Sequence, residues 1–190
     1  MAEEYQEVRR ETIPVAIYTP FWVARGAIHR LAPIRLSDHL NVEGEDFIEL
    51  HEPRFMDLTK RSLELVPEAG PWFIQRGQIL IVHELPSPSA APSPPSPAPP
   101  PVRIPKFPRP VRLWLGPFRV EGNLFLPEHA ELGAHIARAN TIFLPLTAAT
   151  IALPSWEALG VIHVPFALVN WQRLAIGPSL RDAASPPSEP

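Results

Sequence analysis

The sequence contains no cysteine, and this absence removes several classes of site at once. Disulfide bonds, thiolate zinc ligands and cysteine nucleophiles are all excluded for these 190 residues. A chain without cysteine also fits a reducing compartment. We therefore expect a cytoplasmic protein.

Long apolar runs are absent as well. The most apolar stretch, residues 141–169, is interrupted by Pro145, Pro154, Glu157 and Pro165. It therefore lacks the roughly 18 consecutive apolar residues of a membrane-spanning helix. The first residues, MAEEYQEVRRE, carry charge from the third position onward and hold no apolar segment, unlike a secretory signal. We expect no membrane association.

A strong excess of basic charge is also missing. The net charge is −3, and residues 1–85 carry 9 basic and 14 acidic residues against 8 and 6 in residues 86–190. The two parts therefore have net charges of −5 and +2. Nucleic-acid-binding domains are usually strongly basic, so this balance favours another kind of partner.

Proline, in contrast, is abundant and clustered. The chain has 27 prolines, and 12 of them lie between Pro86 and Pro110. Such a segment favours extended polyproline II and cannot bury enough apolar surface to fold. We predict a proline-rich linker over residues 86–109, acting as a semi-rigid spacer between two domains, and a disordered tail over residues 181–190.

The regions on either side of the linker resemble each other. Pro14 aligns with Pro110, and the same offset of 96 positions holds without a gap for about 45 residues. Apolar positions, a glycine (Gly26 and Gly122) and a histidine stay in step. A slip of one residue extends the match to the end of each region. We predict two tandem domains, over residues 1–85 and 110–180.

Each domain reads as short strands around one helical turn. Residues 15–19 alternate as in a half-buried strand, and Gly26 indicates a bulge or a close backbone approach in the next strand. Leu36 and Leu40 have helical spacing. Residues 46–50 and 72–83 read as strands, and the second of these segments turns near residues 76–78. The prediction is mainly β: two small, barrel-like β-β-α-β-β-β domains, since closure protects strand edges.

One segment of the first domain has a recognisable pattern. Arg35-Leu36-Ser37-Asp38-His39-Leu40-Asn41, followed by Phe47-Ile48-Glu49-Leu50, resembles an uncharacterised family of bacterial domains with a recurrent RLSDxLN…FIxL pattern. The resemblance covers about 45 residues of the first copy. It supports a domain and implies no mechanism.

A second resemblance is to the Sm-like RNA-binding β-barrels. Residues 37–41 (SDHLN) are similar to the first Sm motif, and residues 74–79 (IQRGQI) to the second. The resemblance implies RNA contacts by His39, Asn41 and Arg76. Ser37 stands where that family has aspartate, and the second copy has Ala137 and Trp171 in place of the asparagine and the arginine.

Two histidines, His39 and His135, occupy the same position in both copies. They either contact a ligand on each domain or pack beside the apolar helix positions. The seven histidines show no HxH, HxxxH or HExxH spacing, so we predict no metal site and no cofactor. We find no catalytic constellation and expect a non-enzyme.

The end of the linker carries a regular basic pattern. Arg103, Lys106, Arg109 and Arg112 recur every third residue. Polyproline II has three residues per turn, so these four charges are expected on one edge. That edge either docks on the acidic first domain or an external acidic partner, or is ordinary solvated linker.

These observations favour a non-enzymatic interaction, scaffold or regulatory protein with a protein partner. Two copies of a binding module raise avidity without new chemistry. The alternative is RNA or single-stranded nucleic-acid binding through His39, Asn41, Arg76 and the basic segment. Oligomeric state and partner identity stay open at this point.

Overall fold

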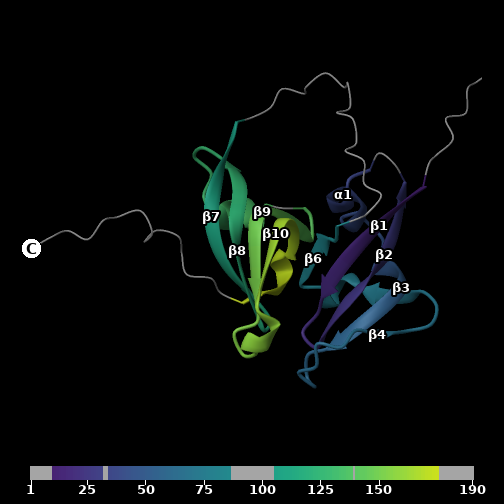
Figure 1. Cartoon of the computed structure of the whole chain (residues 1–190). Coiled ribbons are helices and arrows are strands. Elements are labelled where there is room, and N and C mark those ends of the chain that lie inside the picture. The colour runs from purple at the N-terminus through teal and green to yellow at the C-terminus, as the bar shows by residue number, and fades with distance from the viewer. Residues whose placement is uncertain (1–9, 32–33, 87–104, 139, 176–190) are drawn as a thin grey trace, which may run out of the picture.

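The computed structural model describes residues 10–31, 34–86, 105–138 and 140–175, and this part of the chain is mainly β, as predicted (Figure 1). The first half contains β1 (Arg10–Tyr18), β2 (Trp22–Leu31), α1 (Leu36–Leu40), β3 (Phe47–Asp57), β4 (Val66–Pro67), β5 (Trp72–Gln75), the 3-10 turn η1 (Arg76–Gln78) and β6 (Ile81–Glu84). The second half contains β7 (Lys106–Leu115), β8 (Phe118–Pro127), α2 (Leu132–Ala137), β9 (Phe143–Ala152), η2 (Glu157–Leu159), β10 (Val161–Asn170), η3 (Trp171–Arg173) and β11 (Leu174–Ala175). Within these ranges, no helix has the length and apolar character needed to cross a bilayer.

The element boundaries recur at the offset seen in the sequence. β7, β8, α2 and β9 each begin 96 residues after β1, β2, α1 and β3. η3 begins 95 residues after η1, which matches the one-residue slip. The predicted helical turn at Leu36–Leu40 and the turn at residues 76–78 are confirmed.

Each half has a β-bulge at its matched glycine. The β2–β3 register shifts between Arg25 and Ala27, and the β8–β9 register shifts between Glu121 and Asn123. A Cβ on Gly26 would lie 2.6 Å from the His51 carbonyl oxygen, and a Cβ on Gly122 would lie 3.1 Å from the Thr147 carbonyl oxygen. The left-handed residues that follow also match: Glu52 (φ 48°) and Ala148 (φ 47°). The close approach predicted at Gly26 is confirmed.

The expected pair of small barrels does not form, because the strands make one sheet that is not closed. The strand order is β11-β7-β8-β9-β10-β6-β1-β2-β3-β4, with β5 on β3. β6 pairs with β1 on one side and with β10 on the other. Since β10 takes the second edge of β6, the halves lie side by side instead of being held apart by a spacer (Figure 1).

β1 is buried on both faces, whereas its alternation predicted a half-buried strand. Ile13, Val15 and Ile17 belong to one apolar cluster, and Ala16 and Tyr18 belong to another. The second cluster is built largely from the second half, whose Phe118 ring meets the Tyr18 ring edge-on at 5.3 Å. Packing between the halves therefore covers the face that the sequence pattern leaves polar or exposed.

The predicted linker is shorter at its C-terminal end than the sequence suggested. β7 begins at Lys106, so residues 106–109 are strand, not linker. Prolines 108 and 110 are tolerated because this part of β7 pairs with β8 on one side, and β11 pairs only with Trp114 and Leu115. Residues 87–104 and the predicted tail at 181–190 lie outside the described residues.

Candidate functional site

The most distinctive surface of the first half lies at the start of β3, which pairs with the end of β5. A pocket there is lined by two predicted contact residues, His39 and Arg76, together with His29, Glu45, Asp46, Phe47, Ile48, Glu49, His51 and Phe73. The pocket thus combines imidazoles, carboxylates and exposed rings. It lies within the first half.

Arg76 is held by the loop that precedes β3. Its guanidinium donates to the Val42 carbonyl, to the Glu45 carboxylate at 3.1 Å and to the His39 carbonyl at 3.5 Å. Only 3% of the residue is exposed, and this burial lowers the pKa of Arg76. Its Nε is the one buried side-chain nitrogen or oxygen without a partner in the described part of the chain. The side chain therefore braces the loop, and little of it faces outward.

Asn41 acts at the contact between the halves. Its Oδ1 accepts from the Ile142 and Phe143 amides at 2.9 and 2.8 Å, and its Nδ2 donates to the Phe143 carbonyl at 3.1 Å. This asparagine therefore clamps the start of β9. The sequence resemblance assigned it to RNA, and no sequence signal pointed to this long-range role.

His39 is half-buried on α1, and His135 is half-buried on α2. Burial lowers the pKa of His39 below its usual range, with the Glu45 carboxylate acting in the opposite direction. Of His39 and His135, the first lines the pocket and the second does not. The structure therefore brings His39 and Arg76 together and leaves His135 in the other half.

The basic segment does not form one charged edge over the residues that the structure describes. Lys106, Arg109 and Arg112 lie on β7, whose side chains alternate with a period of two, so Arg109 faces away from the other two. Arg112 pairs with Glu121 of the same hairpin at 2.8 Å, and Arg109 donates to the Glu128 carbonyl at 2.9 Å. Arg103 lies outside the described residues.

Two further histidines of the pocket lining, His29 and His51, have their rings tilted against each other. Their ring centroids are 4.1 Å apart, His29 bonds Thr12 Oγ1 at 3.0 Å, and His51 lies 3.4 Å from Glu49. Across the described ranges, no group of three or more histidine or acidic residues has a geometry that could hold a metal.

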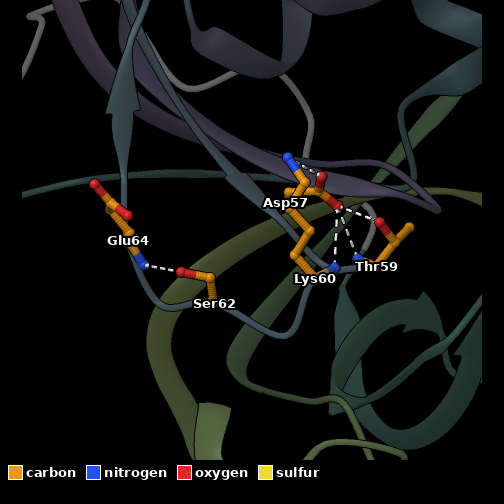
Figure 2. A network of polar contacts seen from close by, with 5 residues as sticks. All are labelled: Asp57, Thr59, Lys60, Ser62 and Glu64. Carbon is orange, nitrogen blue, oxygen red and sulfur yellow. Dashed lines mark hydrogen bonds and ion pairs between the residues drawn. The ribbon is translucent and has the colours of Figure 1, made fainter.

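The turn after β3 is fixed by its own polar contacts. Asp57 Oδ1 accepts from the Thr59 amide and hydroxyl at 2.9 and 2.6 Å, while Lys60 Nζ lies 3.4 Å from Oδ2 (Figure 2). The Thr59 hydroxyl bond is the main reason that the pKa of Asp57 is lowered. The Glu64 amide donates to Ser62 Oγ nearby. These contacts shape a loop and build no site.

Exposed aromatic side chains lie on β5 and on the start of its partner strand β3. Phe47, Trp72 and Phe73 are 54%, 41% and 64% exposed. In the described structure β5 pairs only with β3, so its other edge carries unpaired backbone groups. Apolar rings beside an open strand edge are the usual ingredients of a protein-binding surface.

No family model, curated protein or solved structure matches this chain. The two resemblances described above therefore rest on the sequence motifs alone.

Proposed function

We propose that this chain is a non-enzymatic protein-interaction module, made of two copies of one small β-rich unit, and that it binds protein along the β5 edge. The observation that carries the proposal is the exposure of Phe47, Trp72 and Phe73 on β3 and β5, beside the edge of β5 that has no strand partner in the described structure. Monomeric proteins usually cover or charge such an edge. The recurring element boundaries and the matched bulges support the duplication.

Binding at this edge has a simple physical basis. An incoming extended strand completes the hydrogen-bond ladder of β5, and the aromatic rings supply apolar area that becomes buried. Aromatic residues are the side chains most often found to dominate binding energy. The carboxylates of Glu45, Asp46 and Glu49 in the adjoining pocket favour a basic or neutral partner and oppose a phosphate backbone.

A capture experiment with matched variants tests this proposal. The full-length chain is immobilised and exposed to lysate after nuclease treatment, alongside Phe73→Glu and Phe21→Glu. Phe21 is 62% exposed but lies in the turn between β1 and β2, so it controls for loss of an exposed ring.

We expect a protein partner that survives nuclease and moderate salt, falls by about tenfold or more with Phe73→Glu, and is unchanged with Phe21→Glu. Recovery of nucleic acid that is lost with salt would instead identify the RNA-binding alternative. Equal recovery with both variants would show that the β5 edge is not the binding surface.

A further inference from the structure

The ladder formed by β3 and β5 turns one face to the apolar core and the other face outward. Ile48 lies opposite Ile74 in this pairing, and both belong to the apolar cluster of the first half. Glu49 and Phe73 are their neighbours along the strands and also lie opposite each other. Because successive strand residues point to opposite faces, Glu49 and Phe73 project from the outer face. Both are exposed, so no described element covers them.

Aromatic rings accompany a carboxylate on this outer face. Phe47 precedes Glu49 by two residues on β3, so the two side chains point the same way. Phe73 stands across from Glu49, and residues directly opposite in a ladder have Cβ atoms about 5 Å apart. All three residues line the pocket. A cation that pairs with Glu49 therefore lies within reach of two rings, whose faces attract cations.

The pocket also holds more negative charge than its own cation neutralises. Arg76 pairs with Glu45 at 3.1 Å, and its other bonds are to backbone carbonyls. Among the residues that the structure describes, Asp46 takes part in no ion pair, and Glu49 has only the His51 imidazole at 3.4 Å. An imidazole carries charge only when it is protonated, so Asp46 and Glu49 lack a permanent positive partner.

The pocket has the dimensions of a side-chain site. Its volume is about 410 Å³, within the range of roughly 300–1,000 Å³ that is usual for ligand pockets. An extended segment that pairs with the free edge of β5 directs every second side chain over the outer face. Lysine and arginine carry their charge on long apolar stems. Such a stem can lie along the Phe73 ring while its charged head reaches Glu49.

We propose that the partner of the β5 edge is an extended segment with a lysine or arginine, and that this basic side chain enters the pocket beside Phe47 and Phe73 to meet Asp46 and Glu49. This inference rests on the proposed function, since it names the chemistry that the same surface recognises. Main-chain bonds to β5 supply affinity, and the basic side chain supplies selectivity. The same two carboxylates disfavour an acidic segment.

A selection from a displayed library of random twelve-residue peptides tests the proposal, with the full-length chain as bait. Parallel selections use Phe73→Glu, which blocks the outer face, and Phe21→Glu, which controls for the loss of an exposed ring. We expect the enriched peptides to share a lysine or arginine at one fixed position among β-forming residues. Wild type and Phe21→Glu should recover them, and Phe73→Glu should not.

The affinity of the most enriched peptide then isolates the role of charge. Fluorescence anisotropy compares it with a copy in which norleucine replaces the basic residue, because norleucine keeps an apolar stem and removes the charge. The double change Asp46→Asn and Glu49→Gln should weaken the basic peptide about tenfold and leave the norleucine peptide unchanged. The matched control is Glu64→Gln with Glu84→Gln, two exposed carboxylates of the first half that do not line the pocket. Circular dichroism establishes that each variant is folded.

A second pair of variants isolates the role of the ring. Phe73→Leu keeps apolar area on the outer face and removes the aromatic surface. It should weaken the basic peptide about threefold, and Phe73→Trp should bind it at least as well as wild type. The norleucine peptide should respond less to both changes. Equal responses of the two peptides would show that the ring contributes apolar contact alone and does not hold a cation.

The outcomes separate this inference from the proposed function. Enriched peptides that lack a basic residue, or equal losses with the pocket pair and the control pair, would overturn the basic side chain as the recognised group. If such peptides still depend on Phe73, the interaction module stands. If no peptide is enriched while protein capture from lysate still depends on Phe73, the extended basic segment is refuted and the module again stands. Loss of both kinds of binding would refute both proposals.

Discussion

The two halves of this molecule share most of their elements in the same order, although the first has β4 where the second has η2, and their edges have different surroundings. β10 runs for 10 residues and pairs on both sides, whereas β5 runs for 4 residues and pairs on one side in the described structure. Matched phenylalanines are buried in one half and exposed in the other. Repetition of sequence therefore sets where strands form, and the neighbour of each strand sets what that strand exposes.

Arg76 and Trp171 show that matched positions can keep a role while changing chemistry. Arg76 donates to the Val42 carbonyl ahead of β3, and Trp171 Nε1 donates to the Thr141 carbonyl ahead of β9. Arg76 ties η1, the turn after β5, to the loop before β3, and Trp171 ties η3, the turn after β10, to the loop before β9. A shared bracing role explains why an arginine and a tryptophan align.

The largest difference between the halves is expected at the two bulge glycines. Gly26→Ala should lower the free energy of unfolding by about 3 kcal/mol, because its Cβ would lie 2.6 Å from a backbone oxygen. Gly122→Ala should cost about 1 kcal/mol, since its nearest neighbour is 3.1 Å away. Urea denaturation measures both.

Gly133→Ala is the matched control for the glycine pair. Nothing lies within 4 Å of a Cβ at Gly133, which is on α2, so this change should leave stability unchanged or slightly raised. Equal losses for Gly26→Ala and Gly122→Ala would show that the first half is no tighter at its bulge than the second.

The next effect concerns the clamp that only the first half has. Asn41→Ala should destabilise the chain by about 2 kcal/mol, because it leaves the Ile142 and Phe143 amides without their acceptor. The Ser37 hydroxyl donates to the carboxylate of the neighbouring, exposed Asp38, so Ser37→Ala should change stability little. Urea denaturation followed by tryptophan fluorescence compares the two, and an Asn41→Ala chain as stable as wild type would refute the clamp.

The smallest effect is a pH dependence that belongs to the first half. His83 Nδ1 lies 3.0 Å from the Glu84 carbonyl oxygen, and its Nε2 lies 3.0 Å from the Tyr18 hydroxyl. Burial lowers the pKa of His83 in the folded chain. The unfolded chain then binds more protons, so stability should fall as the pH drops below about 6.5.

The urea midpoint measured from pH 7.5 downward checks this sign. His83→Gln should reduce the slope of stability against pH relative to the wild-type chain. A slope that is the same in both chains would show that His83 does not titrate in this window. The second half has Trp114 where the first has Tyr18 and contributes nothing through this pair.

Much of the local structure could be predicted from sequence patterns. The spacing of Leu36 and Leu40 indicated α1, and the repeat offset anticipated the start of four elements in the second half. Gly26 indicated the bulge because glycine in a strand commonly marks a close backbone approach. These features depend on residues near one another or on the comparison of one half with the other.

The site was less predictable, because its residues gain their roles from distant contacts. Asn41 and Arg76 were read as ligand contacts, yet Asn41 bonds the backbone of β9, and Arg76 bonds the backbone of residues 39 and 42 and the Glu45 carboxylate. The basic side chains at 106–112 were expected to lie on one edge, as in polyproline II with three residues per turn. Pairing with β8 makes this segment a strand, in which successive side chains point to opposite faces. Phe47 and Phe73 were not singled out, since nothing local shows whether an apolar strand residue will find a cover.

The sequence by itself determined the β-rich composition, the positions of the strands and turns, and the close match between two regions of the chain. Backbone sterics and apolar periodicity act over a few residues, so they can be read from the sequence. Only the tertiary structure decided that β10 takes the second edge of β6, which keeps the sheet open and buries both faces of β1. Strand pairing joins residues far apart in the chain, and a strand with two possible neighbours carries no local mark of which one it will meet.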